Sequence, residues 1–251
     1  MNSRKSWSGV ASIARFNWPY YATALGVALS ATITITAVDH FWIKLAALCA
    51  LLGSGYFLLV SLGVSYLVYD CSDLYRWHWL AKLHVPKSMD AAICCYTGFD
   101  DCSESLREKL QPQSWYVLDH YDAKTMTEAS IQRARHLHPP APHAFSCNFD
   151  HWPCHVPRAQ IIIGMLAIHE LRNAQQRIDW FMQAKQKLTP DGSIVIIEHT
   201  RNLANFIAFG PGFLHFHSRA TWQHSWTSAG LTCCKEFSIT PWIRVFQLIS
   251  S

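Results

Sequence analysis

Residues 160–198, QIIIGMLAIHELRNAQQRIDWFMQAKQKLTPDGSIVIIE, decide the fold of the second part of this chain. Gln160–Ile168 is an apolar run typical of a buried strand, and Ala174–Leu188 carries apolar side chains at helical spacing. Residues 189–192, Thr-Pro-Asp-Gly, turn the chain into a second apolar strand at Ile194–Glu198. Two buried strands joined by a helix predict a βαβ unit in a parallel sheet that is covered on both faces.

The same alternation extends on both sides of this unit. Before it, we expect strands at Asp90–Tyr96 and Trp115–His120, with at most one short strand near Phe145–Asn148. After it, two strands at about Leu231–Phe237 and Ile243–Ile249 close the domain with an antiparallel edge. The sequence therefore predicts an α/β fold with a Rossmann-like, doubly wound, mostly parallel sheet.

Helix starts are predicted from capping residues. Asp101–Glu104 and Thr125–Glu128 have the pattern of a capping box, in which the first and fourth side chains satisfy free backbone N–H groups. A third capped helix is expected to begin at Ser218 and to end at Gly230.

Two uncharged apolar runs precede the α/β part, at about Trp18–Val38 and Leu45–Tyr69. Each is long enough to cross a bilayer as a helix, and the short connection predicts an antiparallel hairpin. A cleaved signal peptide is disfavoured because the first run is too long and a second run follows at once. Basic residues flank the hairpin outside the connection, and this bias predicts that both termini and the α/β domain are cytoplasmic; these residues are Arg4, Lys5, Arg15, Arg76 and Lys82.

The expected organisation is an N-terminal segment (1–17), a transmembrane hairpin (18–69), a linker (70–89) and an α/β domain (90–251). The net charge of +4 comes without a dense basic block, so no nucleic-acid partner is expected. Nine cysteines include the adjacent pairs Cys94–Cys95 and Cys233–Cys234 but no CxxC motif. In a reducing compartment this pattern favours free thiols.

Ionisable residues follow four of the expected strands: Asp100-Asp101 come after the first, and Asp119-His120-Tyr121-Asp122 come after the second. His169-Glu170 and Glu198-His199 follow the two strands of the central unit. The aromatic segment 209–218 adds His215 and His217, which suit an active-site lid with a general base or a loop against the membrane. Since ligands of open parallel sheets bind beyond the carboxyl ends of the strands, we expect these side chains to line one site.

The run from Arg177 to His199 resembles the region after strand four of class I S-adenosylmethionine-dependent methyltransferases. Leu188, Pro190 and Gly192 match that family's Leu-x-Pro-Gly-Gly-like turn, with Asp191 in place of the first glycine. The resemblance covers about residues 90–251 and implies S-adenosylmethionine as cofactor. It also implies that Gly98 lies under the cofactor and that the ribose-binding acid is Asp119 or Asp122.

The chain departs from the family pattern at two places. The glycine-rich loop after the first strand is reduced to Gly98, and the proline-punctuated stretch 139–157 replaces the helix expected between strands three and four. Gly98, Asp119 and Asp122 also fit ordinary turn or capping roles.

The resemblance and the hairpin together predict a membrane-anchored methyltransferase that acts on a small, bilayer-partitioning acceptor such as a quinone, isoprenoid or lipid. The oligomeric state is left open. We expect five residues to line the substrate side as catalytic residues: His169, Glu170, His199, His215 and His217.

Two other functions fit the same residues. One is a metal-dependent enzyme, most simply a hydrolase, in which the four histidines with Glu170 or Glu198 bind zinc or iron. Their spacing matches no specific metal motif, so no metal ligand is predicted. The other is a non-catalytic membrane scaffold on a degenerate methyltransferase fold, which the reduced glycine loop favours.

Overall fold

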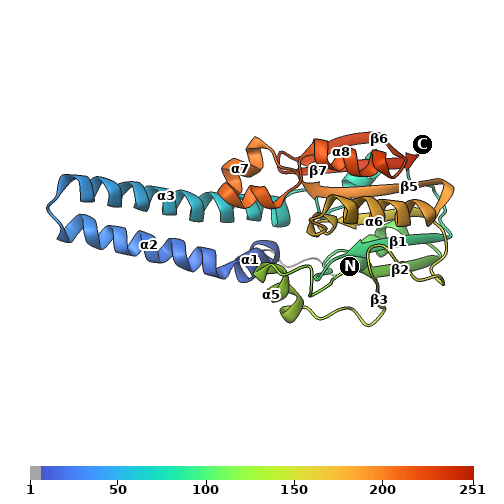
Figure 1. The fold of residues 1–251 in the computed structure, drawn as a ribbon, viewed down its shortest axis with the longest axis horizontal. Coiled ribbons are helices and arrows are strands. Elements are labelled where there is room, and N and C mark those ends of the chain that lie inside the picture. Colours follow the sequence, from blue (N-terminus) through green and yellow to red (C-terminus); the bar gives the residue numbers. More distant parts are fainter. Residues whose placement is uncertain (1–6) are drawn as a thin grey trace. The chain divides into compact units, whose positions relative to one another are not determined.

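The structure is a computed structural model that describes residues 7–251 (Figure 1). The chain divides into two compact units. The first contains the chain up to residue 72 together with residues 203–213, and the second contains residues 73–202 and 214–251. The second unit holds the sheet.

The helical unit is built around a hairpin. Helices α2 (Trp18–Ala37) and α3 (Phe41–Tyr66) lie side by side and antiparallel, as Figure 1 shows. They are joined near their open end by stacking of Tyr21 on Phe57 and by the hydroxyl of Tyr21, which lies 3.1 Å from that of Ser61.

Two shorter helices complete this unit. Helix α1 (Ser8–Phe16) begins against the carboxylate of Asp70, which accepts the backbone N–H groups of Gly9 and Val10 at 2.8 Å each. Asp70 lies in a π-helical turn, Leu67–Cys71, that continues α3. Helix α7 (Leu203–Phe209) packs against α3, where the hydroxyl of Tyr56 donates to the carbonyl of Ile207.

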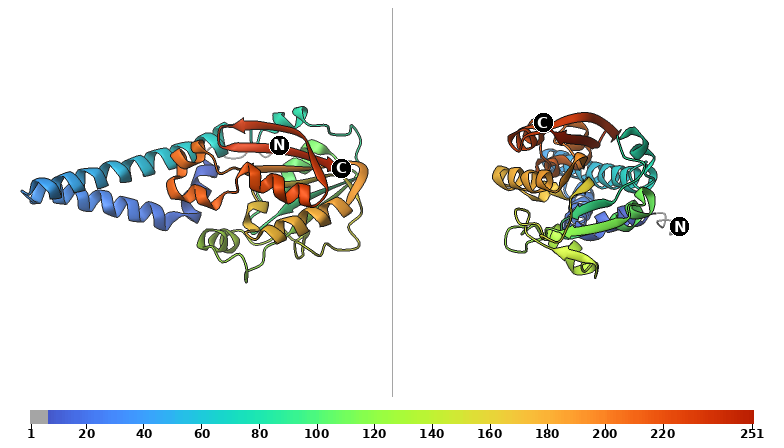
Figure 2. Two further views of the ribbon diagram at one scale, coloured as in Figure 1. Left: turned by 45° about the horizontal axis from the view of Figure 1, so that its top comes forward. Right: turned by 90° about the vertical axis from the view of Figure 1, so that its right-hand side faces the viewer.

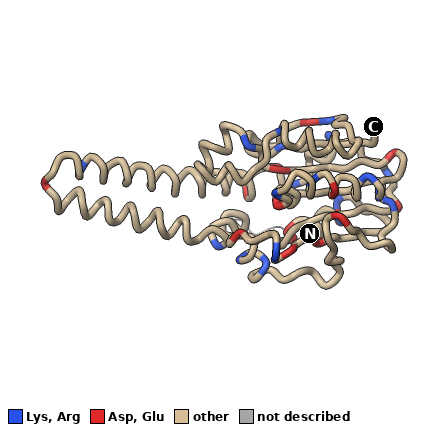
Figure 3. Tube along the Cα trace, viewed as in Figure 1, with Lys and Arg blue, Asp and Glu red and all other residues tan. Residues whose placement is uncertain are grey.

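Two helices, α2 and the continuous helix Phe41–Cys71, are long and apolar enough to cross a membrane by length and composition. Between Trp18 and Tyr66, all within the described chain, Asp39 and Lys44 are the only charged residues, and both lie near the closed end of the hairpin (Figure 3). The second helix starts at Phe41, before the apolar run predicted from Leu45, and Lys44 in its first turn pairs with Asp39 at 2.8 Å.

The second unit is a seven-stranded sheet in the order β3-β2-β1-β4-β5-β7-β6. Strands β1 to β5 pair in parallel, and β7 pairs antiparallel with both β5 and β6. The predicted doubly wound, mostly parallel sheet is confirmed. Its strands are β1 (Ala91–Tyr96), β2 (Ser114–Asp119), β3 (Ala144–Ser146), β4 (Ala159–Met165), β5 (Leu188–His199), β6 (Leu231–Thr240) and β7 (Ile243–Ser250).

The predicted Pro-Asp-Gly turn lies inside β5 as an irregularity of the strand. Ala159 pairs with Leu188, but two residues later Ile161 pairs with Ser193, so residues 189–192 bulge out of the ladder. Gly192 is required there, because a Cβ atom would lie 2.9 Å from the carbonyl oxygen of Ala159.

Helices α6 and α8 lie side by side on one face of the sheet (Figures 1 and 2). Trp180 and Phe181 of α6 and Trp222 and Trp226 of α8 are fully or almost fully buried there. Phe246 of β7 faces Trp226, and the next residue, Gln247, points to the opposite face as strand alternation requires. The helices of this unit are α4 (Ser103–Leu110), α5 (Ala129–Leu137), α6 (Ala174–Gln186) and α8 (Arg219–Ser228).

On the opposite face, the segment before β1 covers the sheet. The side-chain amide of Gln247 bonds both backbone groups of His84, at 3.0 and 2.9 Å. A short 3-10 helix, His78–Lys82, carries the buried Trp79 in this segment. This pairing holds the end of the segment, at His84, on the sheet.

Two predicted capping boxes are wrong in detail, whereas the third cap is confirmed. The carboxylate of Asp100, not Asp101, accepts the N–H groups of Cys102 and Ser103 at the start of α4. Helix α5 begins at Ala129, after the predicted start, with Glu128 as its N-cap residue but without a side-chain cap bond. At α8 the hydroxyl of Ser218 accepts the N–H of Thr221, as predicted.

Within the described chain, no helix lies between β3 and β4, as the proline-punctuated sequence predicts. Residues 147–158 instead cross the α6 face as a loop. Trp152 of this loop packs on Trp180 and on His120, with ring centroids 5.8 and 5.4 Å apart. The loop therefore covers this part of the sheet unit in place of a helix.

Candidate active site

The carboxyl ends of β1, β2, β4 and β5 meet at one edge of the sheet, because these strands are parallel neighbours. The strand order reverses between β1 and β4, which is the switch point where open α/β sheets bind ligands. The hydroxyl of Thr97, just after β1, donates to the carbonyl of Ala167, just after β4, at 2.8 Å. The two strand ends are thus tied together.

Glu198, at the end of β5, organises the end of β4. Its side chain is fully buried, and Oε1 accepts the backbone N–H groups of Ala167, Ile168 and His169 at 2.9–3.2 Å. Oε2 lies 2.7 Å from Nδ1 of His169. A single carboxylate therefore caps the 3-10 turn Ile168–Glu170 and sets the orientation of the His169 ring.

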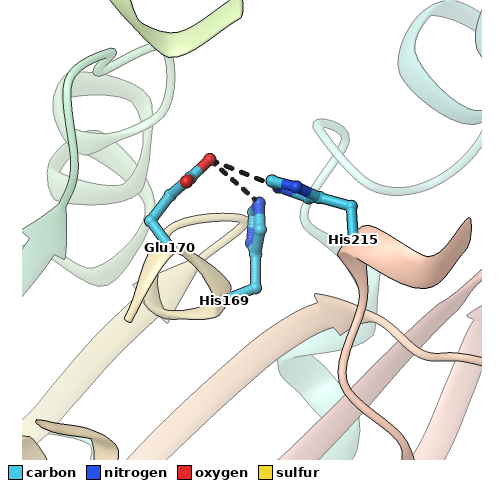
Figure 4. Close-up of side chains that lie close together, drawn as sticks. All are labelled: His169, Glu170 and His215. Carbon is cyan, nitrogen blue, oxygen red and sulfur yellow. Dashed lines mark ion pairs between the residues drawn. The ribbon is translucent and has the colours of Figure 1, made fainter. Parts of the chain in front are cut away.

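The other edge of the His169 ring faces Glu170 and His215. Nε2 of His169 and Nε2 of His215 each lie 3.5 Å from Oε1 of Glu170. Figure 4 shows the Glu170 carboxylate opposite the two imidazole rings. We call these three residues the His–Glu cluster.

His215 is held on its far side by groups from two other elements. Its Nδ1 lies 2.8 Å from Oε2 of Glu128, the N-cap residue of α5. The guanidinium of Arg172 contacts Glu128, the carbonyl of His215 and Nδ1 of that ring. Arg201 further donates to the carbonyls of Leu214 and Phe216, which fixes the backbone around His215.

The cluster carries charge at neutral pH. Burial opposes the charge on His169, but Glu198 and Glu170 outweigh it and raise the pKa of His169 to about 10. Burial also opposes the charge on Glu170, but its hydrogen bond with His169 and the charge of His169 lower the pKa of Glu170. At neutral pH an imidazolium therefore lies between two carboxylates.

His217 lies beside the cluster. Its Nε2 is 3.2 Å from the carbonyl oxygen of His169 and 3.3 Å from Nη1 of Arg177. Burial and the positive charges of Arg177 and His169 lower the pKa of His217 to about 3. The ring is therefore neutral at pH 7. His199 contributes a stacking surface instead, since its ring lies 4.6 Å from that of Phe216 at 16°.

The predicted cofactor residues form a second set at the ends of β1 and β2. Gly98 has a φ of +74°, a conformation that favours glycine. A Cβ atom there would lie 2.8 Å from Cγ1 of Ile131 and 3.3 Å from the Tyr121 ring. These two side chains pack directly over the glycine.

Asp119 and Asp122 differ in what they contact. Asp119 ends β2 and is fully buried; Oδ1 accepts the N–H of Tyr121, and Oδ2 lies 2.6 Å from Nη1 of Arg135 without hydrogen-bond geometry. Asp122 is half-buried and accepts the N–H of Lys124 and the hydroxyl of Thr125. Oδ2 of Asp119 is thus held by an ion pair with Arg135, whereas both oxygens of Asp122 bond within its own turn.

The contacts bring some predicted site residues together and leave others apart. His169, Glu170 and His215 converge, and His217 joins them through the backbone of His169. Gly98, Asp119 and Asp122 lie at the neighbouring strand ends. Helix α5 links the two sets, because Glu128 at its start contacts His215 and Arg135 near its end pairs with Asp119.

Sequence reasoning missed two contributors from α5. The sequence pattern indicates Glu128 as part of a capping box and indicates no role for Arg135. No local pattern indicates their partners, which lie 87 and 16 residues away along the chain. Glu198 was recognised as part of the rim, but its capping of three backbone N–H groups depends on how β4 and β5 pair.

Burial of His120, next to Asp119, should make the free energy of unfolding depend on pH. Burial lowers the pKa of His120 to about 4 from its ordinary 6.5. The unfolded chain therefore binds more protons between pH 6.5 and 4, and the folded state loses about 3 kcal/mol across that window. We expect urea unfolding of the detergent-solubilised chain to give a steeper loss below pH 6.5 than in His120→Phe. Equal pH slopes in both proteins would contradict the assignment.

Comparison with known proteins rests on structure, because no protein-family model and no curated protein matches the chain. A chain of the complex between the Haloferax volcanii Trm112 methyltransferase activator and a methyltransferase aligns with a TM-score of 0.51 at 14% identity, covering 71% of this chain and 89% of that one. An O-methyltransferase from neocarzinostatin biosynthesis, solved with S-adenosyl-L-homocysteine and 1,4-dihydroxy-2-naphthoic acid, aligns with a TM-score of 0.46 at 14% identity, covering 91% and 70%.

A S-adenosylmethionine-dependent methyltransferase from Clostridium acetobutylicum aligns at 6% identity with a TM-score of 0.46, covering 64% of this chain and 85% of that one. The alignment with the methyltransferase of the Trm112 complex, together with the strand order, shows that the sheet unit has a methyltransferase-type fold, and the resemblance predicted from the Pro-Asp-Gly region is confirmed at the level of the fold.

Proposed function

We propose that this chain is a membrane-anchored, S-adenosylmethionine-dependent methyltransferase that acts on a small lipophilic acceptor. The observation that carries the proposal is the buried carboxylate of Asp119, which ends the second strand of a methyltransferase-type sheet and whose Oδ2 is held by an ion pair with Arg135 and accepts no hydrogen bond among the described residues. A carboxylate at this position suits the two hydroxyls of a ribose.

When bound, S-adenosylmethionine supplies an electrophilic methyl group. Asp119 would hold the ribose, and the residues over Gly98, Ile131 and Tyr121, would have to shift to admit the rest of the cofactor. The guanidinium of Arg135 would also leave the carboxylate of Asp119. The work of the protein is then largely to position the two reactants, which is the main source of rate in such transfers.

The acceptor side is assigned to the five predicted catalytic residues. His169 and Glu170 are ionised and lie at the switch point, where they can orient a polar head group. His199 and Phe216 add a stacked aromatic surface beside them. His215 and His217 complete the set, so the predicted acceptor has one polar end and an apolar body.

Membrane anchoring is supported by the helical unit. Helix α2 has 20 residues and therefore a length of about 30 Å, which matches the hydrocarbon core of a bilayer. Aromatic residues lie at both ends of the hairpin, with Trp18 at one and Phe41 and Trp42 at the other, as in interfacial belts. We propose two spans with both termini and the sheet unit in the cytoplasm, in accord with the flanking basic residues.

Helix α7 supports a lipophilic acceptor. It belongs to the same compact unit as the hairpin, and its side chains Leu203, Phe206 and Ile207 are exposed. Exposed apolar side chains next to membrane spans are typical of segments at the bilayer surface. A substrate dissolved in the bilayer would meet such a segment first.

Binding of S-adenosylhomocysteine tests the proposal. We expect the full-length chain in detergent to bind it with micromolar affinity in calorimetry, and Asp119→Ala to weaken binding by about 10- to 100-fold, because a hydrogen bond to a charged group is lost. Asp122→Ala is the matched control, because the Asp122 carboxylate accepts hydrogen bonds only from Lys124 and Thr125 of the turn that follows it. The affinity of this variant for S-adenosylhomocysteine should stay within about threefold of that of the wild type. No heat of binding at several hundred micromolar ligand would overturn the proposal.

A further inference from the structure

The structure assigns a divalent transition-metal site to the His–Glu cluster: we propose that Nε2 of His169, Oε1 of Glu170 and Nε2 of His215 bind one ion such as zinc or iron(II). The inference does not depend on methyl transfer, since the three ligands are separate from the Asp119 end of the site.

The first argument is the convergence of the donor atoms. Both imidazole nitrogens lie 3.5 Å from Oε1 of Glu170, and all three atoms lie within 4.8 Å of one another. Zinc bonds of about 2.0–2.1 Å place tetrahedral ligand atoms roughly 3.3–3.4 Å apart. Small side-chain rotations therefore suffice to place all three atoms around one ion. Figure 4 shows that the carboxylate and both rings point toward a common centre.

The second argument is the hydrogen bonding of the two histidines. Nδ1 of His169 is bonded to Glu198, and Nδ1 of His215 is bonded to Glu128, at 2.7 and 2.8 Å. A carboxylate on Nδ1 orients the ring so that Nε2 faces the ion, as at most metal-binding histidines, and binding would release the Nε2 proton of the His169 imidazolium. At His215 the guanidinium of Arg172 also contacts Nδ1, so the undisturbed arrangement is the one at His169.

The charges around the cluster are compatible with a cation. Three carboxylates face it or its ligands, those of Glu128, Glu170 and Glu198, against the guanidiniums of Arg172 and Arg177. Arg172 approaches His215 at Nδ1, on the opposite edge of the ring from Nε2. Arg177 is directed to His217 and to backbone carbonyls. Among the described residues, neither guanidinium contacts one of the three proposed ligand atoms.

The donor set also indicates which ion and which role. Two imidazoles and one carboxylate suit zinc, iron(II) or cobalt(II) and not calcium or magnesium, which prefer oxygen ligands. Three protein ligands leave at least one coordination position open. The side chains of His169 and Glu170 are about 10% exposed and that of His215 22%, so water or a substrate oxygen can reach the site.

Metal binding is tested on the full-length chain, purified in detergent with an affinity tag that contains no histidine. Elemental analysis after equilibrium dialysis against zinc is expected to give about one ion per chain. His215→Ala and Glu170→Gln should each weaken binding by at least about 100-fold, and Glu128→Gln by about 10- to 100-fold, because it only orients a ligand. His224→Ala, at an exposed histidine of α8, is the matched control and should bind as wild type.

Two further readouts separate this site from the nine cysteines and from misfolding. Cobalt substitution should give an absorption spectrum without thiolate-to-metal charge transfer, because no sulfur is a ligand. Zinc should raise the melting temperature of wild type but not of His215→Ala, as binding to the folded state requires. Absence of binding at about 100 µM zinc, or binding unchanged in both His215→Ala and Glu170→Gln, would overturn the site. S-adenosylhomocysteine affinity measured on the same samples reports separately on the proposed methyltransferase function.

Discussion

Glu198→Ala is expected to destabilise the sheet unit by roughly 3 to 5 kcal/mol. The substitution leaves three buried backbone N–H groups without their acceptor and removes the partner of Nδ1 of His169. For a domain of this size the change corresponds to a melting temperature lower by about 10 °C. Differential scanning fluorimetry of the full-length chain in detergent measures it.

Glu198→Gln is the matched control for this prediction. A glutamine carbonyl oxygen can still accept the three N–H groups, so most of the stability should remain. The pKa of His169 should fall, because its nearest carboxylate is gone. Because the pKa of His169 is higher in the folded state, protonated His169 stabilises the fold fully below pH 6.5, and this stabilisation is lost as the pH rises through about 10. The contribution should be smaller in the glutamine variant. Equal melting temperatures of wild type and Glu198→Ala would refute the capping role.

Arg177→Met is expected to have the second large effect, again about 3 to 5 kcal/mol. The guanidinium is buried, and its Nη1 donates to the carbonyls of Leu171 and Arg172 at 2.7 and 2.8 Å. Its Nε donates to the hydroxyl of Ser225 in α8 at 3.2 Å. Methionine fills a similar volume but leaves these acceptors unpaired in a dry interior, and that loss determines the cost.

Hydrogen exchange localises the effect of this substitution. We expect faster exchange in the segment that follows His169 and Glu170 and around His217, because Arg177 joins α6 to both. Arg177→Lys should be intermediate, since one ammonium group cannot replace a fork of donors. A loss of stability below about 1 kcal/mol in Arg177→Met, with unchanged exchange, would show that the guanidinium is dispensable.

The fold was largely predictable because its signals are local. Apolar β-branched runs at residues 160–168 and 194–198 and the amphipathic helix between them specify a βαβ unit without distant contacts. The capping boxes predicted at 101–104 and 125–128 were less reliable. At α4 the neighbouring residue Asp100 caps the helix in place of Asp101. At α5 the side chain of Glu128 contacts Arg172 and His215 and does not cap the helix.

The sequence predicts at which edge of the sheet the site lies, but it does not predict which side chains contact one another there. Parallel strands end at one edge, so the sequence places His169, Glu170 and His199 there before any coordinates are known. In an extended segment His215 and His217 would lie on one side. The chain instead forms a 3-10 turn at Gly210–His215, and the two rings approach His169 from different directions.

The apolar helical hairpin and the doubly wound α/β sheet follow from local sequence, because hydrophobic period and run length act within a few residues. Which ionisable side chains meet depends on tertiary packing. The pairing of Glu198 with His169 and of Glu128 with His215 depends on strand register and on the docking of α5. Side chains that are 29 and 87 residues apart leave no trace of their partnership in the local sequence.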